Sequence, residues 1–294
     1  MKKIVFTGSA TAMVTPFTDD GIDLVALNRT LDYQMAQSTD ALVMAGTTGE
    51  PSTMSMNEKA DLIEHTVERV NGRLPVIAGV GGNNTKQVIL EAKQAKALGV
   101  DALLAVTPYY NKTTQAGMVA HFNAVADATD LPIILYNVPS RTGLNMLPET
   151  LCAVVEHENI VAIKEASSDI VQIAEMARLC PDISLYSGND DQIVPILSLG
   201  GRGVISVLSN VAPKQVHDMC ALWFAGDVNA AKDLQLHLLP LVKALFCEVN
   251  PIPVKAAVER MGFVTGGVRL PLVSMTAANF ARLEKELKAV GLIK

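Results

Sequence analysis

A lysine ends an apolar, strand-like run in this chain. Residues 161–163 are Val-Ala-Ile, and Lys164 follows them. An ammonium group at the end of a buried strand is costly to desolvate, so it either finds a carboxylate partner or its pKa falls. The adjacent Glu165 would face the opposite side of the strand. Lys164 is therefore either a lysine that extends to water or pairs with another acid, or a neutral amine able to attack a carbonyl carbon.

A segment rich in glycine and threonine, Gly46-Thr47-Thr48-Gly49-Glu50, follows a second apolar run. The two glycines would allow backbone N–H groups to turn toward one point, and the threonines add hydroxyl groups. Such a nest binds a carboxylate or a phosphate. An ordinary glycine-rich turn between a strand and a helix is the alternative.

Three of the five tyrosines of the chain, Tyr109, Tyr110 and Tyr136, fall at the ends of two further apolar runs. Phenol groups there could pass protons near Lys164, although a lone tyrosine more often buries its ring and keeps its hydroxyl wet. Arg141 lies in the loop after Tyr136, where a guanidinium suits a bidentate contact with a substrate carboxylate. A surface salt bridge is the commoner use of arginine.

Two more run ends, Tyr186-Ser187-Gly188-Asn189-Asp190 and Gly203-Val204-Ile205-Ser206, would complete the wall of such a site. The glycines in residues 79–82 do not form a dinucleotide-binding fingerprint, so no cofactor is predicted. The whole set suits carbonyl chemistry through an imine. The nest would hold the carboxylate of a keto acid while Lys164 forms a Schiff base, and an enamine would then attack a second carbonyl, or the reverse reaction would cleave a carbon–carbon bond.

Alternating strand and helix patterns position these residues. The predicted strands cover residues 10–15, 41–44, 76–80, 102–107, 133–138, 161–166, 183–187 and 204–207, and the helices between them cover 23–38, 55–70, 85–98, 114–128, 148–156, 169–179 and 190–199. Eight such units predict an α/β protein, a (β/α)8 TIM barrel, with an open doubly wound sheet as the alternative. In a barrel the carboxyl ends of all strands meet at one rim, which would bring the residues above together.

Beyond the eighth strand the pattern is helical only, over residues 213–225, 228–247, 253–261 and 276–290. The first of these helices would close the barrel. Gly226 and Asp227 would stop one helix and cap the next. We therefore predict a catalytic barrel in residues 1–226 and a C-terminal helical domain in residues 227–294.

The composition narrows the class of protein. Hydrophobic residues make up 49% of the 294 positions and charged residues 18%, which excludes disorder. The net charge of −6, without a run of lysine or arginine, argues against a nucleic-acid partner. No apolar run approaches the roughly 18 residues of a membrane-spanning helix, and polar residues interrupt any signal-like start, so a cytoplasmic protein without a membrane partner is expected.

Cysteine and histidine patterns give no metal site. The four cysteines are far apart in the sequence and show no CxxC spacing, which indicates reduced, structural thiols. The five histidines are equally dispersed, and none has a second histidine or a cysteine at metal-ligand spacing. We therefore predict no metal ion.

Over nearly its whole length the chain resembles the dihydrodipicolinate synthase family of pyruvate-dependent aldolases. The motifs that carry the resemblance occur in the order of that family: Gly46-Thr47-Thr48-Gly49-Glu50, Thr107-Pro108-Tyr109-Tyr110-Asn111, Tyr136-Asn137-Val138-Pro139-Ser140-Arg141-Thr142-Gly143, Ile163-Lys164-Glu165-Ala166 and Asn250-Pro251-Ile252-Pro253-Val254-Lys255. The resemblance implies condensation of pyruvate with L-aspartate 4-semialdehyde, an early step of lysine biosynthesis through diaminopimelate.

The resemblance also implies catalytic roles. Lys164 would form the imine with pyruvate, and Tyr136 would be the proton donor and acceptor. Thr47 would link Tyr136 to Tyr110 in a proton relay, and Tyr110 would reach into the site of a neighbouring subunit. Members of the family are mostly homotetramers, built as a pair of tight dimers.

Substrate-binding roles are carried over in the same way. Thr48 and Ile205 would contact pyruvate, and Gly188 would line the pocket. Arg141, at the entrance, would bind the carboxylate of the semialdehyde.

The chain departs from the family at the dimer-interface site where lysine inhibits many members. The inhibited pattern has serine, alanine, two histidines, asparagine, glutamate and tyrosine, and this chain has Pro51, Ser52, Met56, Lys59, Asn83, Gln87 and Tyr109, of which only Asn83 and Tyr109 match. Loss of the glutamate removes the partner for the amine of lysine, and Lys59 adds a like charge. Weak or absent inhibition by L-lysine is expected.

Two alternatives remain. A sister enzyme of the same family, such as N-acetylneuraminate lyase or a 2-keto-3-deoxy sugar acid aldolase, would share the lysine and the tyrosine. Thr47-Thr48 and Arg141 resemble the synthase and not the sugar lyases. A catalytically silent barrel is the other alternative, but it would have no need of Thr47, Tyr110, Tyr136 and Lys164 together.

Overall fold

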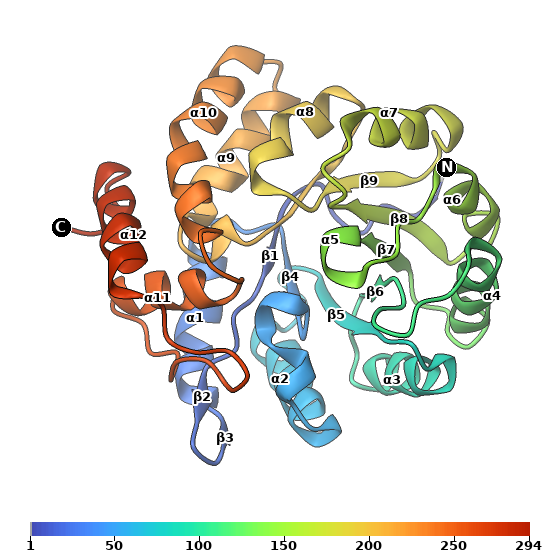
Figure 1. Cartoon of the computed structure of the whole chain (residues 1–294), viewed down its shortest axis with the longest axis horizontal. Coiled ribbons are helices and arrows are strands. Elements are labelled where there is room, and N and C mark those ends of the chain that lie inside the picture. Colours follow the sequence, from blue (N-terminus) through green and yellow to red (C-terminus); the bar gives the residue numbers. More distant parts are fainter. Residues whose placement is uncertain (1) are drawn as a thin grey trace.

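Within residues 2–294, which the computed structural model describes, eight parallel strands form a closed barrel (Figure 1). Around the ring the order is β1-β10-β9-β8-β7-β6-β5-β4, and β1 pairs with β4 to close it. The strands are β1 Gly8–Ala12, β4 Ala41–Met44, β5 Val76–Gly81, β6 Ala102–Val106, β7 Ile133–Asn137, β8 Ile160–Glu165, β9 Ser184–Ser187 and β10 Gly203–Ser206. The predicted (β/α)8 barrel is confirmed, and the open sheet is wrong.

Helices surround the barrel and continue beyond it. They are α1 Leu24–Ala36, α2 Met56–Val70, α3 Thr85–Ala97, α4 Gln115–Ala126, α5 Pro139–Thr142, α6 Pro148–Val154, α7 Ile170–Leu179, α8 Ile193–Ser198, α9 Pro213–Phe224, α10 Val228–Leu245, α11 Ile252–Arg260 and α12 Ala277–Ala289. Local sequence explains their ends. Ser55 and Glu58 form a capping box at the start of α2, and Gly99, with φ +82°, follows the end of α3.

Two apolar layers hold the barrel together. Inside it, alternate residues of neighbouring strands pack against one another, among them Ala10, Val43, Ile77 and Ile205. Outside it, the other face of each strand packs on the helices, which explains why the strands read as nearly continuous apolar runs. The strand ends at the rim are left as the places where polar side chains can meet.

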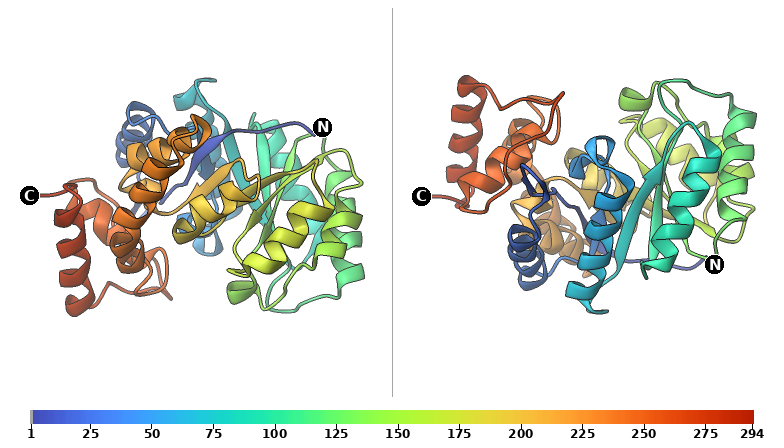
Figure 2. Two further views of the ribbon diagram at one scale, coloured as in Figure 1. Left: turned by 90° about the horizontal axis from the view of Figure 1, so that it is seen from above. Right: turned by 90° about the horizontal axis from the view of Figure 1, so that it is seen from below.

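The last three helices pack beside the barrel and not over its rim. In Figures 1 and 2, α10, α11 and α12 lie together at the side of α1 and α9, with α12 outermost. Their buried faces share one apolar cluster with α9 and β10. Gly226 has φ +88° and the side chain of Asp227 accepts the Ala230 N–H, so the helix stop and the cap predicted at this point are confirmed.

Several boundaries differ from the sequence expectation. The first strand ends at Ala12 and not at residue 15, because the Val14 N–H donates to the Asn210 side chain and leaves the ladder. Residues 190–199 are not one helix. A 3₁₀ turn over Asp190–Gln192 precedes α8, because the Asp190 side chain binds the backbone after β10.

Several short elements were not predicted. Strands β2 Phe17–Thr18 and β3 Gly21–Ile22 form a small hairpin, and α5 is a single turn that begins with a proline at its first position. No helix within residues 2–294 is long and apolar enough to cross a membrane.

Candidate active site

The side chain of Lys164 points into the barrel near the carboxyl end of β8. The strand register places Lys164 beside Tyr136 of β7 and Tyr186 of β9, so the three side chains point to the same side. Lys164 is 5% exposed, and its Nζ lies 4.3 Å from the centroid of the Tyr136 ring. The lysine does not extend to water.

The surroundings of Lys164 favour its neutral form. Burial lowers its pKa from 10.5 to about 8; the Asp190 carboxylate opposes this change, and the Arg141 guanidinium adds to it. A downward shift of this size raises the fraction of neutral amine at pH 7 by roughly a few hundredfold. The arrangement provides a nucleophilic amine near neutral pH.

Asp190 is a buried acid that the sequence analysis placed in the wall of the site but to which it gave no chemical role. It is 2% exposed, and its Oδ2 accepts the N–H groups of Val207 and Leu208 at 3.0 and 2.9 Å. Its Oδ1 has no hydrogen-bond partner among residues 2–294. Burial raises the pKa of Asp190, and Lys164 is among the groups that lower it. Only its position after β9 could have indicated that it belongs to the site.

Tyr136 lies between Lys164 and the threonine segment. Its ring is 7% exposed, and burial raises its pKa, while the Arg141 guanidinium and a hydrogen bond with Thr47 lower it. A phenol with one hydrogen-bond partner and a neighbouring amine can give and take a proton. The structure thus brings Lys164, Tyr136 and Thr47 together.

The segment of residues 46–50 is a 3₁₀ turn over Thr47–Gly49, in which the Gly49 N–H donates to the Gly46 carbonyl at 2.8 Å. The left-handed residues are Ala45, with φ 53°, and Glu50, with φ 58°, and not the two glycines. The glycines serve close packing instead. A Cβ on Gly49 would lie 3.0 Å from Thr15 Oγ1 and 3.2 Å from the Met13 carbonyl oxygen.

An ion pair inside the protein fixes the end of this segment. Lys255 Nζ lies 2.8 Å from Glu50 Oε1, and both side chains are at most 2% exposed. The backbone N–H of Arg269 donates to the other Glu50 oxygen at 3.0 Å, and Asn250 Nδ2 donates to Thr48 Oγ1 at 3.0 Å. Residues beyond the barrel therefore hold the nest. Sequence reasoning gave no such role to Glu50, Asn250 or Lys255.

Gly188 lies against the lysine. A Cβ on Gly188 would lie 2.7 Å from Ala166 Cβ, 3.0 Å from the Glu165 carbonyl oxygen and 3.1 Å from Lys164 Cε. Real Cβ atoms do not approach another atom as closely as 2.7 Å, and the contact with Lys164 Cε would be tight, so glycine leaves this wall of the site undisturbed.

A cavity of about 180 Å³ joins these groups. Six of the eight site residues predicted from sequence line it: Thr47, Thr48, Tyr136, Arg141, Lys164 and Gly188. Phe246 and Asn250, which follow α10, also line it, so the C-terminal region contributes to the wall. The cavity combines an amine, a phenol, the hydroxyls of Thr47 and Thr48 among others, and a guanidinium, which suits a small carboxylated carbonyl compound.

The other two predicted residues do not line this cavity. Ile205 is completely buried inside the barrel, and Val207, two residues further on, takes its place in the wall. Tyr110 is 91% exposed and has φ 63°. It lines neither this cavity nor the wider one beside it.

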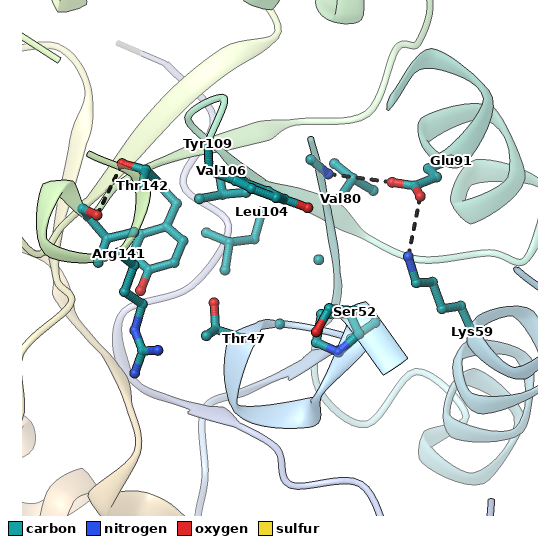
Figure 3. A pocket seen from close by; sticks show the side chains of 17 residues that line it. Thr47, Ser52, Lys59, Val80, Glu91, Leu104, Val106, Tyr109, Arg141 and Thr142 are labelled. Atoms are coloured by element: carbon teal, nitrogen blue, oxygen red, sulfur yellow. Dashed lines mark hydrogen bonds and ion pairs between the residues drawn. The ribbon is translucent and has the colours of Figure 1, made fainter. Parts of the chain in front are cut away.

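A second, wider cavity of about 390 Å³ shares Thr47, Tyr136 and Arg141 with the first. Figure 3 shows Thr47 and Arg141 on one side of it and Lys59 and Glu91 on the other. Lys59 Nζ lies 3.3 Å from Glu91 Oε1. The acid that lines this cavity is therefore already paired.

Comparisons with known proteins agree with this chemistry. The Dihydrodipicolinate synthetase family matches residues 5–290. The 4-hydroxy-tetrahydrodipicolinate synthase of Caldicellulosiruptor saccharolyticus is 55% identical over 289 residues, which are 98% of each chain. Two crystal structures are similar along nearly the whole of both chains. One is a dihydrodipicolinate synthase from Acinetobacter baumannii complexed with pyruvate, with 42% identity, a TM-score of 0.95, and 98% of this chain and 99% of that one covered.

The second crystal structure is a dihydrodipicolinate synthase from Cyanidioschyzon merolae with lysine bound. It has 40% identity and a TM-score of 0.96, and the match covers 99% of this chain and 100% of that one. These identities extend over both the barrel and the C-terminal helices. The chain therefore belongs to the dihydrodipicolinate synthetase family and is an enzyme, a lyase of the class I aldolase type.

Proposed function

We propose that the chain is a 4-hydroxy-tetrahydrodipicolinate synthase, which condenses pyruvate with L-aspartate 4-semialdehyde in the biosynthesis of lysine through diaminopimelate. The observation that carries the proposal is the buried Lys164, whose pKa falls to about 8 beside Tyr136 and Arg141. The names of the similar proteins support the choice of substrates.

The first half of the reaction forms an enamine. The neutral Lys164 amine attacks the keto carbon of pyruvate, and loss of water gives an imine. Thr48 and its neighbouring backbone N–H groups hold the pyruvate carboxylate, and Gly188 leaves space beside the lysine. Removal of a methyl proton then gives the enamine.

In the second half the enamine carbon attacks the aldehyde carbon of the semialdehyde, and a carbon–carbon bond forms. Tyr136 donates the proton that the new hydroxyl needs, and Thr47 connects Tyr136 with Tyr110 of a neighbouring subunit. Arg141 holds the semialdehyde carboxylate at the entrance. The amine of this substrate then attacks the imine carbon, which closes the ring and frees Lys164. No step calls for a metal or a cofactor.

Trapping of the imine tests the mechanism. Borohydride with pyruvate should add a stable mass to the peptide that contains Lys164, and Lys164→Ala should abolish it. Lys255 is the other buried lysine among the described residues. Lys255→Arg keeps a positive charge beside Glu50, so the adduct should persist in that variant. An enzyme that shows no adduct, or an adduct at another lysine, would refute the Schiff base at Lys164.

The rival reaction is that of a sister aldolase, N-acetylneuraminate lyase or a 2-keto-3-deoxy sugar acid aldolase. Both would give the same trapped adduct, so a second assay is needed. The full chain should consume L-aspartate 4-semialdehyde with pyruvate and should not release pyruvate from sugar acids. If the chain instead releases pyruvate from sugar acids and does not consume the semialdehyde, the imine mechanism would stand but the proposed second substrate would be wrong.

Weak inhibition by L-lysine is part of the proposal. A bound lysine would need a carboxylate for its amine, and Lys59 already neutralises Glu91, which lines the outer cavity. Activity at saturating substrates should therefore not fall at sub-millimolar L-lysine. Lys59→Met, which frees Glu91, should be more sensitive than the parent enzyme. A parent enzyme inhibited in the sub-millimolar range would show that the argument is wrong.

Further parts of the proposal concern organisation. In this proposal the chain acts as a homotetramer, a dimer of tight dimers, as the family resemblance implies, and the exposed Tyr110 serves the site of a neighbouring copy. Residues 1–226 form the catalytic unit and residues 227–294 a helical unit that holds the nest through Lys255. The enzyme works in the cytoplasm on its two small-molecule substrates, without nucleic-acid or membrane partners.

A further inference from the structure

Two thiols far from the active-site cavity lie in contact. Cys152 is on α6, and Cys180 directly follows α7. Their Sγ atoms are 2.7 Å apart, and both cysteines are free. The other two cysteines, Cys220 and Cys247, are also free and make no such contact among residues 2–294.

The separation of the two sulfur atoms is short for atoms that are not bonded. Carbon atoms in ordinary contact lie about 3.5–4.0 Å apart, and sulfur is larger than carbon. A disulfide bond is about 2.0 Å long, so closing it would need a movement of roughly 0.7 Å, which small side-chain rotations can supply. The packing of α6 against α7 thus already holds the two sulfur atoms close to bonding distance.

We propose that Cys152 and Cys180 form a reversible redox pair that closes to an intramolecular disulfide when the enzyme meets a small-molecule disulfide. The site is separate from the aldolase chemistry, so the proposal does not depend on the substrates proposed above.

The two thiols differ in their exposure, which fixes the order of the steps. Cys180 is 6% exposed, and burial raises its pKa to about 12. Cys152 is half-buried, so a small disulfide reaches its sulfur more easily than that of Cys180. Cys152 is therefore the first thiol to react and Cys180 the second.

The exchange balances in atoms and electrons. The Cys152 thiolate attacks one sulfur of the small disulfide, which forms a mixed disulfide and releases one thiolate. The Cys180 thiol then loses its proton to that thiolate and attacks Cys152 Sγ, which forms the internal disulfide and releases the second small thiolate, and this thiolate takes up the proton that the Cys152 thiol gave up at the start. The protein loses two protons and two electrons, and the small disulfide gains both.

The bond would enclose β8, the strand that carries Lys164. The closed loop runs from Cys152 through β8 and α7 to Cys180. Cross-links that close loops of this size stabilise a fold chiefly by restricting the unfolded chain. The oxidised enzyme should therefore melt at a higher temperature than the reduced one.

Mass spectrometry of the full-length enzyme tests the proposal. The native protein is treated with oxidised glutathione, its remaining thiols are alkylated under denaturing conditions, and it is digested without reductant. The expected result is a peptide pair linked through Cys152 and Cys180, with Cys220 and Cys247 alkylated. A reductant should reverse the link and the rise in melting temperature.

Two variants make the order of steps testable. Cys180→Ser removes the second thiol, so a glutathione mixed disulfide should persist at Cys152. Cys220→Ser is the matched control and should still form the internal bond. The proposal is overturned if Cys152 and Cys180 both remain alkylatable in the treated parent enzyme, or if its mixed disulfide persists unresolved. Both of these outcomes are measured in the parent enzyme, so the test still holds if a variant fails to fold.

Discussion

The reactivity of Lys164 follows from its surroundings, since a lysine exposed to water would not be a nucleophile at neutral pH. A lysine in water is nearly all ammonium at neutral pH, whereas the burial of Lys164 lowers its pKa to about 8. The Asp190 carboxylate limits this fall, and the Arg141 guanidinium increases it. The amine therefore remains close enough to neutrality to act as a nucleophile and basic enough to be protonated again.

This balance predicts a pH dependence. Only the neutral amine attacks pyruvate, so the rate of borohydride-trapped adduct formation at limiting pyruvate should rise with pH and level off above the Lys164 pKa of about 8. In Arg141→Ala a neighbouring positive charge is lost, so the plateau should move to higher pH. A rate that keeps rising toward the ordinary lysine pKa of about 10.4 in the parent enzyme would contradict the effect of burial.

Gly188 allows a second test at a single residue. In Gly188→Ala the new Cβ would meet Ala166 Cβ at 2.7 Å, so the strand ends beside the lysine must shift, and the tight contact with Lys164 Cε at 3.1 Å would also displace the lysine side chain. Misplacement of a nucleophile by about 1 Å lowers turnover by on the order of a hundredfold. Steady-state kinetics should show this loss in kcat/KM.

The matched control for Gly188 is Gly82, at the end of β5 on the same rim. A Cβ there has its nearest neighbour at 3.9 Å, Val88 Cγ2, which is an ordinary contact. Gly82→Ala should keep nearly full activity. Equal losses in the two variants would mean that the rim is generally intolerant and that the Lys164 contact is not the cause.

Among the elements, the contact between the nest and α11 matters most for the site. Glu50 holds a left-handed conformation that L residues rarely adopt, and its carboxylate is bound by Lys255 and by the Arg269 backbone. The helix after the barrel thereby stabilises the turn that presents Thr47 and Thr48. This gives the C-terminal helices a role in catalysis without a catalytic residue of their own.

The pair can be tested by removing one partner. Lys255→Met leaves the Glu50 carboxylate buried and unpaired, which costs about 3–5 kcal/mol of the free energy of unfolding. Denaturant unfolding should show this loss, and a Glu50→Gln/Lys255→Met double variant should recover part of it. The control is the ion pair between Arg260 and Glu284, which is much more exposed than the pair between Lys255 and Glu50. Arg260→Met breaks this exposed pair and should change the unfolding midpoint little. A parent-like midpoint in Lys255→Met would show that the pair does not hold the nest.

Features set by neighbouring residues, such as strands and strand ends, could be predicted from the sequence. Contacts between residues far apart in the sequence could not. Alternating apolar runs predicted the barrel, and the strand ends predicted six residues of the cavity wall. Glu50 and Lys255 are 205 positions apart, so no local pattern could pair them. The glycines at 46 and 49 were correctly singled out but for the wrong reason, since packing and not backbone freedom requires them.

At the scale of the whole molecule, one copy of the chain does not bring Tyr110 to the active-site cavity. The phenol is 91% exposed and does not line either cavity beside Thr47. Its backbone has φ 63°, an unusual conformation for tyrosine that costs free energy unless the surroundings compensate for it. A second copy of the chain that accepts the phenol at its own Thr47 would supply that compensation and complete the relay.

Mixing of two damaged enzymes can distinguish sharing of Tyr110 from use within one chain. Lys164→Ala has no nucleophile, and Tyr110→Phe has lost the relay hydroxyl, so each variant alone should be poorly active. In a mixed dimer, the site with an intact Lys164 receives Tyr110 from the other chain and is complete. Random reassociation of equal amounts should therefore recover up to about a quarter of the parent activity, since half of the dimers are mixed and each has one complete site. If Tyr110 served its own chain, every site in the mixture would lack one of the two groups, and reassociation would recover nothing.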